Sequence, residues 1–263
     1  MINFAAYNAG ALASAMAVMM ILAWGGGRLI GRRLRDDLSP PAQPVHEFVS
    51  GKLSPYITLF GLLLGFTFSI SLSRHESRVS MVVADSNAIG DFYTCASLLK
   101  DPVRTQLQAV VRQYAALHLK MARQRLDRSA WENALRSNRI LQYEMTKLVS
   151  DALNQGTPIA VPLTNTLDGV SSASAARLAA VEERVPGTAV LLLFVLAIVT
   201  MALNGLELGR SGACTAAEAI GTLSFIFLIA LAVFVTLDLD QPDRGLITVS
   251  QAPIDRLVSS MSK

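Results

Sequence analysis

The residues with the most evident chemistry lie in or beside two long apolar segments. In residues 53–73 (LSPYITLFGLLLGFTFSISLS), small and hydroxyl side chains recur at helical spacing. They share one helix face, which we call the small-residue stripe: Ser54, Thr58, Leu62, Gly65, Ser69 and Ser73. In lipid such a face serves either close helix packing, through the GxxxG step of Gly61 and Gly65, or the lining of a path for water and ions. The sequence leaves both interpretations open.

An acidic turn follows the last apolar segment. Its sequence LDLDQPDRG (residues 237–245) holds Asp238, Asp240 and Asp243. Carboxylate oxygens are the ligands that Ca²⁺ prefers, so this cluster is the one candidate metal site. The glycine at the sixth loop position and the closing Glu of an EF-hand are missing, which favours the alternative of a hydrogen-bonded stop signal at the membrane interface. No other cofactor is expected.

The side chains that usually carry catalysis are dispersed. His46, His75 and His118 lie in different segments, and none has a second ligand at metal spacing. We expect all three to be solvated surface histidines. The sequence also shows no glycine-rich phosphate loop and no nucleophile elbow around a Ser, so we expect no enzyme.

The distribution of charge indicates a membrane protein. Of the 263 residues, 52% are hydrophobic and 16% are charged, and charged residues are absent from 2–27, 53–73, 185–206 and 219–237. At about 1.5 Å per residue, a helix of roughly 20 residues spans a bilayer core. The net charge of +3 is too small to favour a nucleic-acid partner, and two cysteines exclude a disulfide scaffold.

These segments predict an all-α integral membrane protein with four transmembrane helices and a helical-bundle domain inserted between the second and third. We expect the second membrane helix to continue beyond Arg74 to about Leu99, with further helices at about 103–121, 129–153 and 163–185, because apolar residues recur there at spacings of three and four. The predicted order is transmembrane helix 1–27, basic Pro-containing loop 28–52, transmembrane helix 53–73, extramembrane helical domain 74–184, transmembrane helix 185–206, short loop 207–218, transmembrane helix 219–237, and acidic turn with C-terminal tail 238–263.

Two stretches resemble a known family. DSNAIGDFY (residues 85–93) and LDLDQPDRGLITVSQ (residues 237–251) follow the second and fourth predicted membrane helices. They resemble the bestrophin-like domain of bacterial membrane proteins, over roughly residues 52–260. A more distant similarity runs to bestrophins, whose second helix opens with a Pro and a Gly six residues later, matched here by Pro55 and Gly61. Arg74 and Arg78 match the Arg-containing extension of that helix.

The resemblance to bestrophins implies a pentameric homo-oligomer that passes small anions. It places the narrow neck near Pro55, where this chain has Ser54, Thr58 and Leu62 in place of large apolar residues. It also implies that the acidic turn occupies the position of the calcium clasp of animal bestrophins and that the inserted domain is cytoplasmic. The arginines of the loop 28–52 favour the opposite orientation by the positive-inside rule, so the side that the domain faces stays open.

Two functions are therefore in question. The leading hypothesis is an oligomeric channel in the bacterial inner membrane, passing small anions along an axis lined by the second transmembrane helix. The alternative is a non-conducting membrane scaffold or sensor whose helical domain binds a partner. In both cases we expect the lipid bilayer and copies of the same chain as partners, and no nucleic acid.

Overall fold

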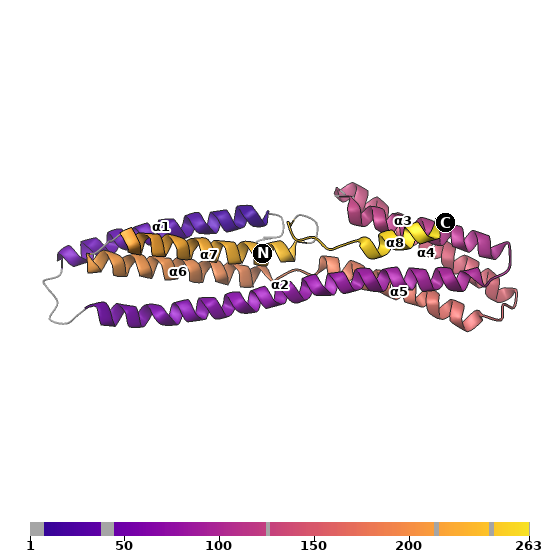
Figure 1. Cartoon of the computed structure of the whole chain (residues 1–263), viewed down its shortest axis with the longest axis horizontal. Helices are drawn as coiled ribbons and strands as arrows, with labels where there is room; N and C mark the ends of the chain where they lie inside the picture. Colours follow the sequence, from indigo (N-terminus) through magenta and orange to yellow (C-terminus); the bar gives the residue numbers. More distant parts are fainter. Residues whose placement is uncertain (1–7, 38–44, 125–126, 213–215, 242–244, 263) are drawn as a thin grey trace. The chain divides into compact units, whose positions relative to one another are not determined.

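The computed structural model describes residues 8–37, 45–124, 127–212, 216–241 and 245–262, with backbone alone for 36, 37 and 45–53. The described residues are almost entirely helical and hold no strand, which confirms the all-α fold class. The helices, labelled in Figure 1, are α1 (Ala9–Asp37), α2 (Val45–Ser97), α3 (Val103–Arg123), α4 (Arg128–Asn154), α5 (Ala160–Glu182), α6 (Gly187–Ser211), α7 (Ala216–Asp240) and α8 (Ala252–Met261).

The chain divides into two compact units. The membrane unit consists of Met1–Arg74 and Arg184–Thr248, and the helical unit consists of His75–Glu183 and Val249–Lys263. Helix α2 contributes its first part to the membrane unit and its second part to the helical unit. The predicted continuation of the second membrane helix beyond Arg74 is confirmed, because α2 is unbroken as far as Ser97.

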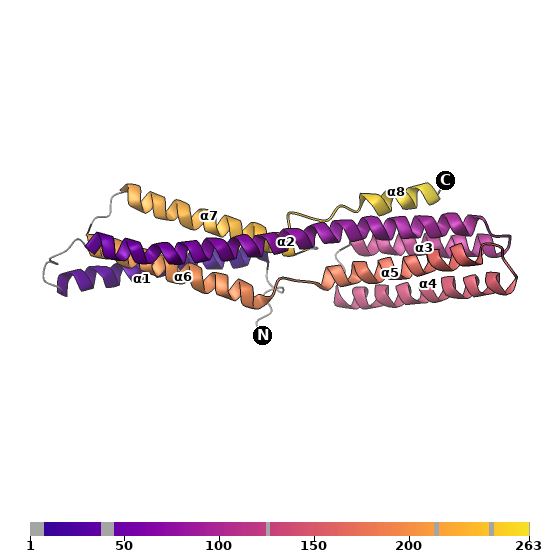
Figure 2. The ribbon, with the colours of Figure 1, turned by 90° about the horizontal axis from the view of Figure 1, so that it is seen from below.

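The membrane unit contains α1, α6, α7 and the first part of α2 (Figures 1 and 2). These are the helices of the described chain that are long and apolar enough to cross a membrane, as the four charge-free segments predicted. Their shared core is built from aliphatic and aromatic side chains, among them Met16 and Met20 of α1, Leu193 of α6 and Val233 of α7.

The membrane helices are longer than the charge-free segments. Helix α1 continues through its arginines to Asp37 and α2 begins at Val45, so both ends of the segment predicted as the loop 28–52 are helical. The arginines end the charge-free segment, but they do not end the helix. A positive charge near the carboxyl end of a helix is favoured by the helix dipole. Helix α6 stops at Gly212, whose φ of 73° is the left-handed conformation that glycine adopts without strain.

The helical unit packs α3, α4, α5 and α8 with the second part of α2 (Figure 2). Its core is formed by large side chains from every helix, including Phe92, Leu107, Met145, Leu163 and Ile254. The predicted helices of this region are confirmed, within a few residues at their ends, by α3, α4 and α5.

Side chains close two of the helix ends in this unit. The carboxylate of Asp127 accepts a hydrogen bond from the amide of Ala130 (2.7 Å) at the start of α4. Buried Arg78 donates to the carbonyl oxygens of Ala180 (3.0 Å) and Glu183 (2.7 Å) at the end of α5. Arg78, expected from the resemblance to lie in the extension of the second membrane helix, therefore caps another helix.

Candidate functional site

Helix α2 packs into the membrane unit through one face. Phe60, Thr67 and Ser71 are buried, and their spacing of seven and four residues puts them on the same side of the helix. Phe60, with Leu63 and Leu64 beside it, enters the apolar core built by α1, α6 and α7. The hydroxyl of Thr67 donates to the carbonyl oxygen of Leu63 (2.8 Å), so the donor of this buried threonine is used within α2 itself.

The small-residue stripe lies on the other side of α2. All six residues of the stripe are exposed, and Leu62 is more than half exposed. At about 100° per residue, the stripe is centred roughly 170° around the helix from Phe60, Thr67 and Ser71. The face that holds α2 to its own subunit and the face that carries the stripe are therefore nearly opposite.

Gly61 and Gly65 of α2 contact no other helix in the described part of the chain. Among the described residues, no atom beyond the adjacent backbone of α2 lies within 4 Å of a Cβ added at Gly61 or at Gly65. This GxxxG step is therefore not used for helix packing within the described part of the chain.

A second pair of GxxxG steps does pack within the chain. Gly27 and Gly31 of α1 face Gly205 and Gly209 of α6, and a Cβ added at any of them falls 2.0–2.3 Å from a carbonyl oxygen of the opposite helix. Only glycine permits this approach, and close backbone contact is the usual source of helix association in lipid. The sequence contains the signal for this contact, because the two glycines on each helix are four residues apart.

The acidic turn binds the protein's own backbone. Buried Asp238 accepts hydrogen bonds from the amides of Leu246 (3.0 Å) and Ile247 (2.9 Å), and buried Asp240 accepts one from the amide of Val185 (3.0 Å). A Cβ added at Gly245 would lie 2.9 Å from the Asp238 carboxyl carbon, so the turn requires glycine there.

Asp238 and Asp240 are thus hydrogen-bonded to backbone amides, which is the kind of contact that the alternative to a calcium site predicted. Asp243 lies outside the described residues. Within the described part of the chain, no three His, Cys, Asp or Glu side chains gather in a way that could hold a metal ion. The assignment of Ca²⁺ to this turn stays a prediction.

The most polar site inside the helical unit is centred on His118. Its Nδ1 lies 2.8 Å from Asp85 Oδ2 and its Nε2 lies 2.8 Å from Asn138 Oδ1, and all three residues are buried. Arg177 donates to the same Asp85 oxygen (2.6 Å) and to Gln251 Oε1 (3.1 Å). One residue each from α2, α3, α4 and α5, together with the residue preceding α8, therefore meets in one network, which we call the Asp85 network.

The expectation of a surface position for His118 is wrong. His118 follows Val111 and Tyr114 by seven and four residues, so it shares their inward face, and its ring lies 4.3 Å from that of Tyr114. The sequence spacing contained this signal, but the polar character of His outweighed it in our prediction. His75 is half-buried, and the side chain of His46 lies outside the described residues.

The electrostatics of the network favour charge on Asp85. Burial disfavours the carboxylate, but the hydrogen bonds and electrostatic attraction of His118 and Arg177 outweigh burial and lower the pKa of Asp85 below its ordinary value. Burial raises the pKa of neighbouring Tyr114 to about 12, so its phenol stays neutral and accepts from Gln142 Nε2 (3.2 Å). The ion pair of Arg177 and Asp85 thus joins α5 to α2 in the interior of the helical unit.

Comparison with known proteins identifies the family. A model of the Bestrophin-like domain matches residues 13–254, nearly the whole chain. The chain belongs to the Bestrophin-like family. No curated protein and no solved structure matches it. The resemblance stated from the two motifs is confirmed, and the match extends it toward the N-terminus to include most of α1.

Membership of the Bestrophin-like family, with four helices that are apolar enough to cross a bilayer, makes this a multi-pass membrane protein. Both sequence stretches that carried the resemblance have structural roles. DSNAIGDFY supplies Asp85 of the network and Phe92 of the core, and its Gly90 lies 3.3 Å, measured from an added Cβ, from Leu257 of α8. LDLDQPDRGLITVSQ supplies the backbone clasp of Asp238 and, at its end, Gln251.

Sequence reasoning on this Bestrophin-like chain missed Arg177, as it missed Asn138. Arg177 joins Asp85 of the first motif to Gln251 of the second, across 92 and 74 residues of sequence. Nothing in the weakly amphipathic, Ala- and Ser-rich segment around it distinguishes it from a solvated arginine. Only its placement in the fold, where it is largely buried, reveals its partners.

Proposed function

We propose that this protein is an oligomeric channel for small anions, in which α2 of each copy faces the axis. The observation that carries the proposal is the position of the small-residue stripe, opposite the face on which Phe60, Thr67 and Ser71 pack. A ring of copies can keep that packing intact and still turn the stripe toward a common centre. The distant resemblance to bestrophins supports an anion as the permeant ion.

The chemistry of the stripe suits a permeation path. Its hydroxyl groups offer hydrogen-bond donors without a fixed charge, and an ion must be able both to enter such a path and to leave it. The Thr58 hydroxyl already donates to the carbonyl oxygen of Ser54 (2.9 Å), which keeps its interaction with a passing ion weak. The proposed conduction requires neither a catalytic residue nor a cofactor.

Chloride and nitrate efflux from proteoliposomes tests the proposal. Thr58→Trp adds bulk on the stripe, and Leu59→Trp adds the same ring one residue later, roughly 100° around the helix. We expect wild-type efflux above that of empty liposomes, a reduction of roughly tenfold or more in Thr58→Trp, and efflux near that of wild type in Leu59→Trp. Equal inhibition by the two variants would contradict a path along the stripe.

The size of the protein in mild detergent provides the second measurement. The proposal predicts an oligomer, because a single α2 cannot enclose a path. A stable oligomer that shows no efflux at high protein density would instead favour the scaffold or sensor. The exposed Tyr143 and Ile140 of α4 would then be the first surface to test for a partner, since both are large and apolar.

A further inference from the structure

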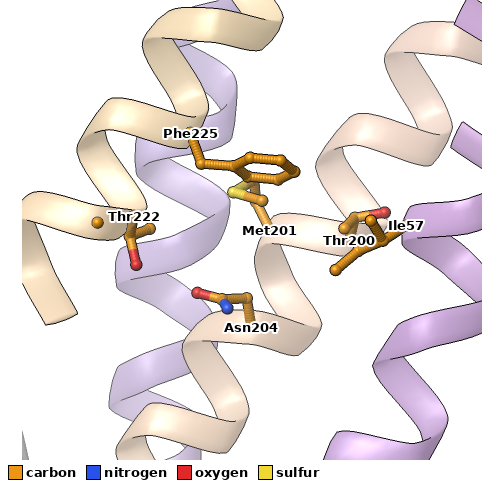
Figure 3. Close-up of a pocket in the computed structure, with 7 residues that line it drawn as sticks. Ile57, Thr200, Met201, Asn204, Thr222 and Phe225 are labelled. Atoms are coloured by element: carbon orange, nitrogen blue, oxygen red, sulfur yellow. The ribbon is translucent and has the colours of Figure 1, made fainter. Parts of the chain in front are cut away.

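A cavity of about 230 Å³ lies within the membrane unit (Figure 3). It is lined by α2, α6 and α7 through Ile57, Thr200, Met201, Asn204, Gly221, Thr222 and Phe225. Figure 3 shows Phe225 and Met201 in the upper part of the view and the carboxamide of Asn204 with the hydroxyl of Thr222 in the lower part. The cavity therefore has an apolar part and a polar part.

The lining residues lie near one end of the membrane helices. Asn204 is two residues from the end of the charge-free segment 185–206, and Ile57 and Thr222 are three or four residues inside the segments 53–73 and 219–237. At about 1.5 Å per residue, these positions are roughly 3–6 Å inside the apolar zone. This depth is just beneath the boundary between the lipid headgroups and the hydrocarbon core. Ile57 and Gly221 are exposed, so the cavity opens on the surface that the bilayer surrounds.

The polar part of the cavity contains an unpaired hydrogen-bond acceptor. Asn204 Oδ1 is buried and has no hydrogen-bond partner in the described chain. Thr200 does not provide one, because its hydroxyl donates to the carbonyl oxygen of Leu196 (2.7 Å). An unpaired acceptor is costly where there is no water to satisfy it, so the site favours a ligand that brings a donor.

We propose that this cavity binds a phospholipid whose headgroup carries hydrogen-bond donors. The acyl chain packs on Ile57, Met201 and Phe225, and the headgroup donates to Asn204 Oδ1. Lipid is the occupant because the opening faces the bilayer. Headgroups such as phosphoethanolamine and phosphoglycerol carry donors, whereas phosphocholine carries none.

Native mass spectrometry of the full chain, delipidated in mild detergent and titrated with defined phospholipids, tests the headgroup preference. One net hydrogen bond predicts that phosphatidylethanolamine and phosphatidylglycerol each bind about threefold to tenfold more tightly than phosphatidylcholine. Asn204→Leu keeps a similar volume but removes the acceptor, so it should bind all three lipids equally. Equal binding by the wild type, or a preference for the anionic lipid alone, would overturn the proposal.

A second pair of variants tests the location of the site. Gly221→Leu fills the opening, and among the described residues no atom beyond the adjacent backbone lies within 4 Å of a Cβ added there, so the fold should tolerate it. Gly26→Leu adds the same bulk at another uncrowded glycine of the membrane unit and serves as the control. We expect Gly221→Leu to lose the tight lipid and Gly26→Leu to keep it.

Unchanged binding in Gly221→Leu would place the lipid elsewhere and refute the site. The site is also refuted if the wild type retains no lipid while cysteines placed at Ile57 and Gly221 cross-link between chains, because a second copy would then cover the opening. None of these results depends on ion conduction, so the lipid site and the proposed channel are tested independently of each other.

Discussion

The two units of this molecule bring their helices together in opposite ways. In the membrane unit, α1 and α6 meet backbone to backbone at facing glycines such as Gly27 and Gly205. In the helical unit, the space between the helices is filled by large side chains, such as Phe92 and Tyr114, around the ion pair of Asp85.

The difference follows from the two solvents. Lipid offers no hydrophobic gain for burying an apolar side chain, so helices associate by close approach of their backbones. Water rewards burial of large apolar groups, and the resulting core can enclose a charged network if its members are paired. Helix α2 belongs to both units. In the membrane unit it packs through one face and leaves the small-residue stripe exposed.

The largest effect is expected from the centre of the helical unit. Asp85→Ala removes the shared partner of Arg177 and His118 and leaves the largely buried guanidinium without its ion pair. We expect a loss of about 3–5 kcal/mol in the free energy of unfolding, measured by denaturation in detergent. Asp91→Ala, at an exposed position of the same helix, should change it by less than about 0.5 kcal/mol. Similar losses in the two variants would show that the network does not hold this unit together.

The next effect is expected where the membrane helices touch. In Gly205→Ala, the new Cβ would lie 2.0 Å from the carbonyl oxygen of Trp24, so α1 and α6 must move apart. We expect a loss of about 1–3 kcal/mol, seen as a lower melting temperature in detergent. A variant as stable as the wild type would remove the distinction that we draw between the two units.

A smaller effect of pH should be confined to the helical unit. Because the folded pKa of Asp85 is lowered, its stabilising contribution is present above the ordinary value of 3.8 and is lost as the pH falls through the folded pKa. The stability difference between wild type and Asp85→Asn should therefore shrink below about pH 4. Hydrogen exchange followed separately in the two units measures this, and a difference that stays constant down to about pH 3 would contradict it.

The smallest effect is expected at the open glycines of α2. No atom of the described chain beyond the adjacent backbone of α2 lies within 4 Å of a Cβ added at Gly65, so we expect Gly65→Ala to change the stability of a single chain by less than about 1 kcal/mol, in either direction. Its matched partner is Gly205→Ala, the same substitution in a GxxxG step of the same spacing. If Gly65→Ala alters the oligomer while Gly205→Ala alters the fold, the two glycine pairs have the different roles assigned to them.

Local pattern predicted most of the fold. The charge-free segments indicated the four membrane helices, and the spacing of apolar residues indicated α3, α4, α5 and the continuation of α2. Helix ends were less accurate, because α1 continues past its apolar segment to Asp37. The first charged residues mark the end of the lipid-embedded segment, but the helix can continue beyond them into water.

The contacts that position the site were harder to predict. The bond from Arg177 to Asp85 joins residues far apart in sequence, and no local pattern encodes such a pairing. The spacing of Gly205 and Gly209 could be seen, but not which helix they face. For the stripe, the sequence identified the residues, and the structure added that Phe60 and Thr67 attach the opposite face of α2.

Thiol accessibility along α2 tests the central claim most directly. With the native cysteines replaced by alanine, single cysteines at positions 58, 65 and 69 of the stripe and at 59, 66 and 70 beside it are exposed, in liposomes, to a charged reagent that cannot enter lipid. We expect the stripe positions to react and the neighbouring positions to stay unlabelled, because only the stripe faces water. Uniform labelling, or labelling of Leu59, Phe66 and Ile70 with a silent stripe, would contradict a water-filled axis lined by α2.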